Sequence, residues 1–158
     1  MTGLALVCVL GAASPAAAAS ATSTLAATIT IQASCQVASS GTLDFGTATS
    51  LAAATDVQTS FAVLCTSATA FNIGLDGGAA PGGTVATRLM TSASGTVGYK
   101  LYSNAAYSTN WGSTVGSDTV PGTGSGGPAV LTVYGRVPPQ ATPAPGTYSD
   151  TVTVTVTY

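Results

Sequence analysis

Histidine and glutamate are absent from this chain of 158 residues, and charged side chains of any kind make up only 5% of it. Without histidine, neither a serine–histidine–aspartate triad nor a cysteine–histidine pair can form. The only carboxylate side chains are aspartates scattered at positions 44, 56, 76, 118 and 150, so no motif pairs two of them for acid–base catalysis. The sequence therefore predicts a protein that is not an enzyme, with no catalytic residue and no small-molecule substrate.

Ligands for metals and phosphate-bearing cofactors are equally scarce. Asp76-Gly77-Gly78 resembles part of a calcium loop, but the further acidic ligands of such a loop are missing, so a tight turn between strands is predicted. The glycine-rich segment 121–128 lacks the lysine and the helix of a phosphate-binding loop, so a flexible loop is expected. We expect no metal and no cofactor.

Positive charge is limited to Arg88, Lys100 and Arg136, and the net charge is −2. Three cations cannot form a basic stripe along a phosphate backbone, so nucleic acid is not expected as a partner. A surface so poor in charge gives little electrostatic protection against self-association. This composition suits a subunit that assembles with others.

The chain begins with features of an export signal. The apolar run at residues 4–13 is too short for a permanent membrane span, and Ala17-Ala18-Ala19 supplies the small residues of a cleavage site. We therefore predict a signal peptide at residues 1–19. Its removal leaves 139 residues, the size of one domain.

After cleavage, Cys35 and Cys65 are the remaining cysteines, because Cys8 lies in the signal peptide. An even pair in an exported protein predicts a disulfide, and a metal site lacks further ligands. The bond would close a loop of about 30 residues and contribute roughly 3–4 kcal/mol in the chain-entropy model.

Short segments with alternating apolar residues fill most of the mature chain and predict strands, separated by turn-forming residues. The expected strands cover residues 35–46 with an interruption, 57–66, 71–75, 87–91, 97–102, 129–137 and 147–158. Residues 103–128 are expected to form a loop, with a short strand at 118–120 and with Trp111 as a packing residue. This pattern predicts an all-β protein, an antiparallel β-sandwich.

Residues 24–33 also alternate, directly after the signal peptide. One face of this expected strand is apolar and consists of Leu25, Ala27, Ile29, Ile31 and Ala33. A strand needs a partner, because an unpaired one leaves open N–H and C=O groups. Periodicity fits two placements equally: a first strand of the chain's own sandwich, or a strand donated to a neighbour.

Three segments together carry a family resemblance: Leu43 to Gly46 (LDFG), Tyr134 to Gln140 (YGRVPPQ) and Gly146 to Tyr158 (GTYSDTVTVTVTY). With the two cysteines, they resemble the spore coat protein U domain family, which includes the pilins of archaic chaperone–usher pili. The resemblance covers nearly the whole mature chain. It implies an immunoglobulin-like sandwich that lacks its final strand. A periplasmic chaperone fills the gap first, and the N-terminal strand of the next subunit fills it afterwards.

The resemblance leads to a specific set of expectations. Residues 20–34 form a donor-strand extension, and residues 35–158 form an incomplete sandwich completed by a neighbouring subunit. The C-terminal strand lines the acceptor groove and binds the chaperone through Val152, Val154, Val156 and Tyr158. The implied partners are identical or related pilus subunits, a periplasmic chaperone and an outer-membrane usher.

The expected function is that of a structural subunit of an extracellular pilus. The subunit is secreted through the periplasm to the cell surface, polymerises by donor-strand exchange, and serves adhesion and biofilm formation. Two alternatives stay open: a tip or adaptor subunit that binds a surface ligand, and a self-complemented coat protein of a spore or cyst.

Overall fold

The computed structural model describes residues 18–39 and 41–158, so the predicted signal peptide lies outside the described residues except for its last two. The chain divides between Thr30 and Ile31 into two units, of which residues 31–158 form the folded one. Residues 18–34 contain no strand. Within the described part of the chain, no helix is long and apolar enough to cross a membrane.

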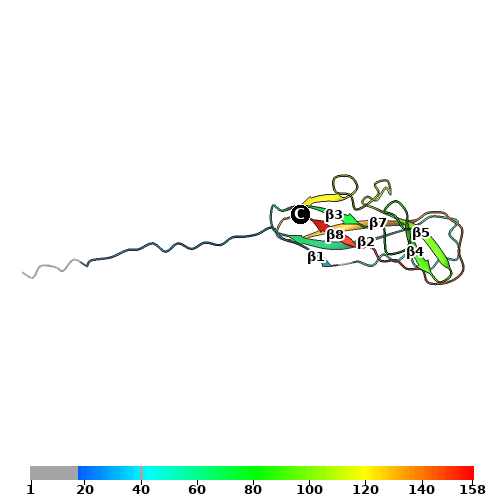
Figure 1. Cartoon of the computed structure of the whole chain (residues 1–158), viewed down its shortest axis with the longest axis horizontal. Coiled ribbons are helices and arrows are strands. Elements are labelled where there is room, and N and C mark those ends of the chain that lie inside the picture. Colours follow the sequence, from blue (N-terminus) through cyan, green and yellow to red (C-terminus); the bar gives the residue numbers. More distant parts are fainter. Residues whose placement is uncertain (1–17, 40) are drawn as a thin grey trace, which may run out of the picture. The chain divides into compact units, whose positions relative to one another are not determined.

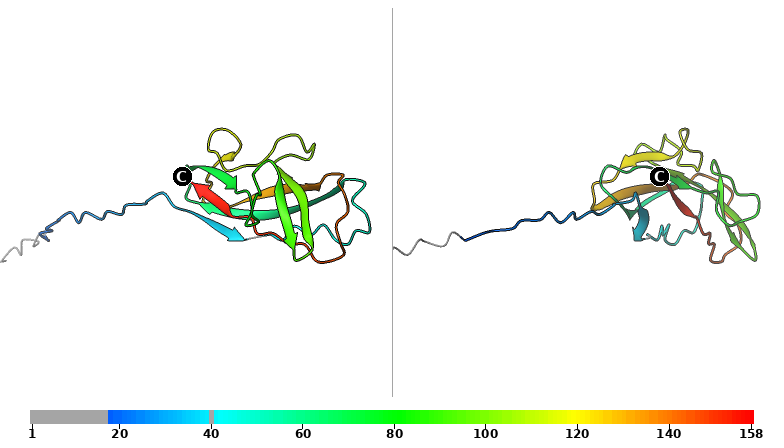
Figure 2. Two further views of the ribbon diagram at one scale, coloured as in Figure 1. Left: turned by 45° about the vertical axis from the view of Figure 1, so that its right-hand side comes forward. Right: turned by 60° about the vertical axis from the view of Figure 1, so that its left-hand side comes forward.

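Two antiparallel sheets form the folded unit (Figure 1). The larger sheet has the order β1 (Cys35–Ser39), β2 (Thr55–Cys65), β7 (Pro128–Val137), β5 (Gly95–Tyr102) and β4 (Arg88–Ser92). The smaller sheet has the order β6 (Val120–Thr123), β3 (Ala70–Leu75) and β8 (Val154–Thr157). The all-β prediction is confirmed, and the curled sheets are consistent with an immunoglobulin-like fold (Figure 2).

Alternation along each strand places apolar side chains between the sheets. In β2, for example, Phe61, Val63 and Cys65 are buried, while Ser60 faces solvent. Burial of a large apolar side chain stabilises the fold by about 1.5–3 kcal/mol. The core contains Leu51, Phe61, Val63, Cys65, Phe71, Ile73, Leu75, Val97, Tyr99, Leu101, Trp111, Val133 and Val137.

Trp111 lies in the core, as predicted, although it comes from the long connection between β5 and β6. Its indole N–H donates a hydrogen bond of 2.9 Å to the carbonyl oxygen of Ile73. The carbonyl oxygen of Trp111 accepts a bond of 2.8 Å from Arg88, whose buried guanidinium also donates to the carbonyls of Leu75, Asp76 and Val85. These bonds attach the connection firmly to the ends of β3 and β4.

Three predicted strands are placed differently by the structure. The strand expected at 35–46 is regular only at Cys35–Ser39, and residues 41–46 belong to no strand. The strand expected at 118–120 is β6 at Val120–Thr123, so Pro121–Thr123 belong to a strand and not to a flexible loop. An edge strand tolerates Pro121, because its missing N–H need not enter a ladder. The strand expected at 147–158 is regular only at Val154–Thr157, because residues 150–153 bond to a loop.

Candidate functional site: a groove between two sheet edges

β1 and β8 lie at the edges of their sheets and are close to each other (Figure 2). Among the described strands, β1 pairs only with β2, and β8 pairs only with β3. Each strand therefore has one edge whose N–H and C=O groups are free to pair with another strand. A groove lies beside the C-terminal segment and includes Val154 of β8, and residues of the segment that follows β1 line its other side.

The groove has a volume of about 490 Å³. One wall consists of Gly41, Thr42, Leu43 and Phe45, and the other consists of residues 148–152 with Val154. Its floor consists of core side chains, namely Phe61, Leu75, Tyr99, Leu101 and Val133. An apolar groove of this kind beside an unpaired edge can bury one extended segment whose side chains alternate.

The groove continues into a second cavity of about 740 Å³. The two cavities share Leu43, Phe45, Met90 and Tyr148. The second cavity ends at the proline-containing loop 142–147, whose Ala144 carbonyl accepts a hydrogen bond of 2.8 Å from the Tyr148 hydroxyl. The groove and this second cavity together extend beyond the regular part of the C-terminal strand.

The structure places three of the four predicted groove residues of the C-terminal strand against the core. Val152, Val154 and Val156 are half-buried and pack on it, and the first two line the groove. Tyr158 is 60% exposed. A residue that sequence reasoning missed is Val37 of β1, which lies opposite the buried Val63 yet is 40% exposed. Its exposure shows that the core-facing side of β1 is only partly covered.

Sequence reasoning also missed Asp150, which lies on the groove wall. Its Oδ2 accepts a hydrogen bond of 2.7 Å from the Tyr99 hydroxyl, and its Oδ1 accepts one of 2.9 Å from the Ala79 N–H. Burial raises the pKa of Tyr99, and the hydrogen bond to Asp150 raises it further. The sequence pattern could have indicated this position, because residue 150 lies two and four residues before the inward-facing Val152 and Val154, and alternate residues of a strand share one face.

A second carboxylate, that of Asp76, binds the backbone of the same wall. Oδ1 of Asp76 accepts bonds of 3.0 Å from the Gly78 N–H and 2.9 Å from the Thr153 N–H. The predicted tight turn at residues 76–78 is thus present, and it also anchors the C-terminal segment. Burial alone would raise the pKa of Asp76, but the hydrogen bonds from Thr153 and Gly78, with nearby Arg88, hold it below its usual value.

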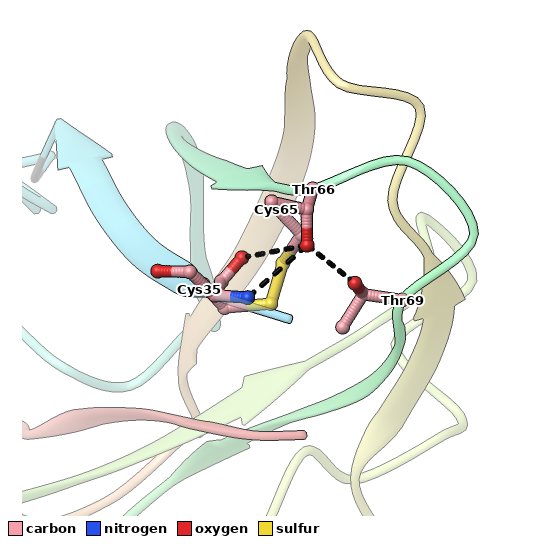
Figure 3. The surroundings of a disulfide bond; sticks show 5 residues. Cys35, Cys65, Thr66 and Thr69 are labelled. Atoms are coloured by element: carbon pink, nitrogen blue, oxygen red, sulfur yellow. Dashed lines mark hydrogen bonds between the residues drawn. A yellow bond between two sulfur atoms is a disulfide. The ribbon is translucent and has the colours of Figure 1, made fainter. Parts of the chain in front are cut away.

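A disulfide joins Cys35 to Cys65 at the start of β1, as predicted (Figure 3). Next to it, the Thr66 N–H donates a bond of 2.9 Å to the carbonyl oxygen of Ser34, and the Ser34 N–H donates one of 3.1 Å to Thr66 Oγ1. Thr66 Oγ1 also lies 2.6 Å from Thr69 Oγ1. The chain is therefore fixed to β2 from Ser34 onward.

The predicted donor segment precedes this attachment. Leu25 is 96% exposed, Ile29 is 85% exposed and Ile31 is 74% exposed, and Ala27 and Ala33 are exposed as well. Exposed large apolar side chains on one face of an extended segment are typical of a binding segment. The donor role of these five residues stays a prediction.

The outer face of the larger sheet carries a different cluster. Arg136 binds both carboxylate oxygens of Asp56 at 2.6 Å and lies 4.1 Å from the ring centre of Tyr107. Tyr107 contacts Tyr102 and Tyr134 edge to face. This cluster accounts for part of the YGRVPPQ segment and lies outside the groove. The described residues contain no group of three or more acidic or cysteine side chains placed to hold a metal ion.

Comparison with known proteins agrees with this architecture. Protein U of Myxococcus xanthus is 37% identical over 160 residues, which cover 92% of this chain and 89% of Protein U. A similar fold, with a TM-score of 0.58 and 21% identity, occurs in the crystal structure of the CsuC–CsuE chaperone–tip adhesion subunit pre-assembly complex from archaic chaperone–usher Csu pili of Acinetobacter baumannii. That match covers 82% of this chain but only 41% of the other chain. The Spore Coat Protein U domain matches residues 21–155. The chain belongs to the spore coat protein U domain family.

Proposed function

We propose that this protein is a structural subunit of an extracellular fibre of the chaperone–usher type and that it polymerises by donor-strand exchange. Residues 24–33 of one subunit enter the groove of the next. The observation that carries the proposal is the open apolar groove beside the C-terminal segment, together with the free edges of β1 and β8. Such a contact is head-to-tail and does not close, so it produces a fibre.

The donor and the groove match in length and in chemistry. Residues 24–33 and the C-terminal segment at residues 148–157, whose side chains alternate in burial, are both ten residues long. Leu25, Ile29 and Ile31 are exposed, and each would contribute about 1.5–3 kcal/mol on burial in the groove. Main-chain hydrogen bonds to the two free edges add affinity, as in other cases of strand addition.

Self-complementation is disfavoured by the attachment of Ser34 to Thr66. To fill its own groove beside β1, the donor segment would have to reverse immediately before Ser34. The residues available for this turn are Gln32 and Ala33, and neither is favoured in two-residue hairpin turns, which prefer glycine, asparagine or aspartate. A second subunit meets no such constraint.

The partners follow from the same groove. The similar solved structure contains a chaperone and a tip adhesion subunit of a pilus, caught before assembly. We infer that a periplasmic chaperone covers the groove of this subunit until an outer-membrane usher exchanges it for a donor strand. The subunit is then exported through the periplasm to the cell surface, where the fibre serves adhesion and biofilm formation.

A coat-forming role is the second candidate, and the likeness to Protein U favours it. Donor-strand exchange could also build a layer around a cell, so the assembly chemistry is the same in both cases. Electron microscopy of cells that produce the protein distinguishes the two. Thin fibres that project from the surface support the pilus, and a continuous layer supports the coat.

The donor role is tested with Ile29→Asp and with the matched control Thr28→Asp on the other face. We expect Ile29→Asp to form its disulfide and accumulate in the periplasm, yet to lose the ladder of multimers seen on gels without boiling. The charge would enter an apolar groove with no partner. Thr28→Asp should keep the ladder. If Ile29→Asp instead destabilises the subunit itself, the strand belongs to its own sandwich and the proposal fails.

A further inference from the structure

We propose that the hydrogen-bonded pair Tyr99–Asp150 sets the register of the donor strand from a second copy of this chain, because only an alanine fits opposite Asp150. This inference rests on the proposed function and concerns the same groove. It assigns to the two residues a role in alignment, in addition to their role in holding the wall.

The C-terminal wall alternates strictly in burial from residue 148 to residue 157. Its even-numbered residues are half-buried, and its odd-numbered residues are exposed. The inward face therefore consists of Tyr148, Asp150, Val152, Val154 and Val156. Among the described residues that line the first cavity, Asp150 is the only charged one. A donor strand beside this wall must place one side chain next to that carboxylate.

The carboxylate is held in a fixed position. Tyr99 and Ala79 each donate one hydrogen bond to it, and Tyr99 is itself 4% exposed on the groove floor. The remaining lone pairs of Asp150 need water or another donor. A branched apolar side chain packed over them would remove that water at a large cost, whereas the small side chain of alanine leaves space for it.

The donor strand offers two alanines among its five apolar positions. In an antiparallel arrangement, Ala33 opposite Asp150 places Ile31 opposite Val152 and Ile29 opposite Val154. In a parallel arrangement, Ala27 opposite Asp150 places Ile29 opposite Val152 and Ile31 opposite Val154. Either direction thus has one register in which the two isoleucines meet Val152 and Val154, the two valines of this face that line the groove.

Neighbouring antiparallel registers, shifted by two residues, are disfavoured at the same position. One shift places Ile31 opposite Asp150. The other requires Cys35, which is already bonded to Cys65 in its own subunit.

Neighbouring parallel registers place Ile29 or Leu25 opposite Asp150. Packing an apolar side chain over the Asp150 carboxylate therefore disfavours both of these registers. In this way a polar group in a groove gives specificity between similar alignments.

Disulfide cross-links between pairs of introduced cysteines report the register in the full-length chain, and Asp150 is left unchanged. Cysteine is placed in the wall as Val152→Cys or Val154→Cys and in the donor at position 27, 29, 31 or 33. In the proposed registers, the wall cysteines cross-link only to Ile29→Cys and Ile31→Cys. Each shifted register brings Ala27→Cys or Ala33→Cys opposite residue 152 or 154. Linked peptides are identified by mass spectrometry of polymers boiled without reductant.

Links from residue 29 or 31 that exceed those from residues 27 and 33 by about tenfold or more support the inference, since 1.4 kcal/mol corresponds to a tenfold preference. Dominant links from residue 27 or 33 overturn it, while the existence of the polymer still upholds the proposed function. If no multimers form at all, the proposed function fails, and the register inference fails with it.

A donor-side variant tests the role of Asp150 without changing the acceptor. We expect Ala27→Leu or Ala33→Leu, whichever faces Asp150, to reduce polymer yield about tenfold, because leucine would cover the carboxylate. The neighbouring Ala26→Leu lies on the opposite face and should keep the native yield. Native yields from both Ala27→Leu and Ala33→Leu overturn the inference.

Discussion

The side chain of Leu43 lies directly against the backbone of Gly135 in β7, so closely that a Cβ atom at residue 135 would collide with it. The same Cβ position is 3.1 Å from the ring of Phe45. Leu43 and Phe45 line both cavities of the groove. The missing side chain at Gly135 thus allows the LDFG segment to fold over the larger sheet and form one wall.

Replacement of Gly135 by alanine should therefore destabilise the subunit by about 1–3 kcal/mol, the usual cost of an added methyl group in a packed site. Because Leu43 would have to move, the groove wall should shift as well. The measurement is urea unfolding of the purified protein. Gly127→Ala is the matched control, because the nearest atom to a Cβ there, Ser125 Oγ, is 3.7 Å away. Equal stability of the two variants would contradict the packing argument.

Strands β2 and β7 of the larger sheet were predictable from the sequence because apolar residues alternate along them. In β2 and β7, each buried residue is followed by a residue with greater exposure, and the expected boundaries agree with the structure within two residues. The disulfide was predictable for a different reason, since two cysteines in an exported chain allow a single pairing. Trp111 was correctly expected to pack in the core.

The course of residues 150–153 was not predictable, because it depends on contacts distant in sequence. Asp76 binds the N–H of Thr153, which is 77 residues away, and no local pattern announces that bond. The structure assigns no strand to residues 150–153, and regular pairing begins only at Val154. Likewise, the exposure of Val37 depends on how much of the core-facing side of β1 is covered by distant segments, which a pattern within β1 cannot reveal. Whether residues 24–33 act as a donor strand stays a prediction.

Gln140 continues the sheet where β7 ends, and this gives the second testable prediction. Its side-chain amide accepts a bond of 2.9 Å from the Gly98 N–H and donates one of 2.8 Å to the Gly98 carbonyl oxygen. Gln140→Ala should leave both groups of Gly98 without these partners and lower the free energy of unfolding by about 1–3 kcal/mol. The control is Gln58→Ala, an exposed residue on β2. A loss of similar size in both variants would speak against a specific role of the Gln140 amide.

Val154→Asp tests the wall of the groove. Val154 is half-buried against the core, so the new carboxylate would lie in apolar surroundings at a cost of about 3 kcal/mol or more. We expect the variant to be degraded in the periplasm and to be barely detectable by immunoblot. Thr155→Asp changes the neighbouring exposed position and should accumulate normally. Normal levels of Val154→Asp would exclude the inward placement of this residue.

The pH dependence of stability should report the bond between Asp76 and the C-terminal segment. Hydrogen bonds from Thr153 and Gly78, with nearby Arg88, outweigh the opposing effect of burial, so the pKa of Asp76 is lower in the folded protein than in the unfolded chain. A carboxylate of this kind stabilises the fold fully above its unfolded pKa of about 3.9, and the contribution is lost as the pH falls through the lower folded value.

Asp76→Asn keeps an oxygen acceptor for Thr153 but does not titrate, so it isolates this contribution. At pH 6 the wild-type protein should be more stable than the variant, because bonds to a charged acceptor are stronger. The difference should shrink as the pH falls below about 4, where protonation of Asp76 removes the advantage. The measurement is urea unfolding of both proteins at a series of pH values from 6 to 3. A difference in unfolding free energy that stays constant over this range would show that Asp76 does not hold the wall through its charge.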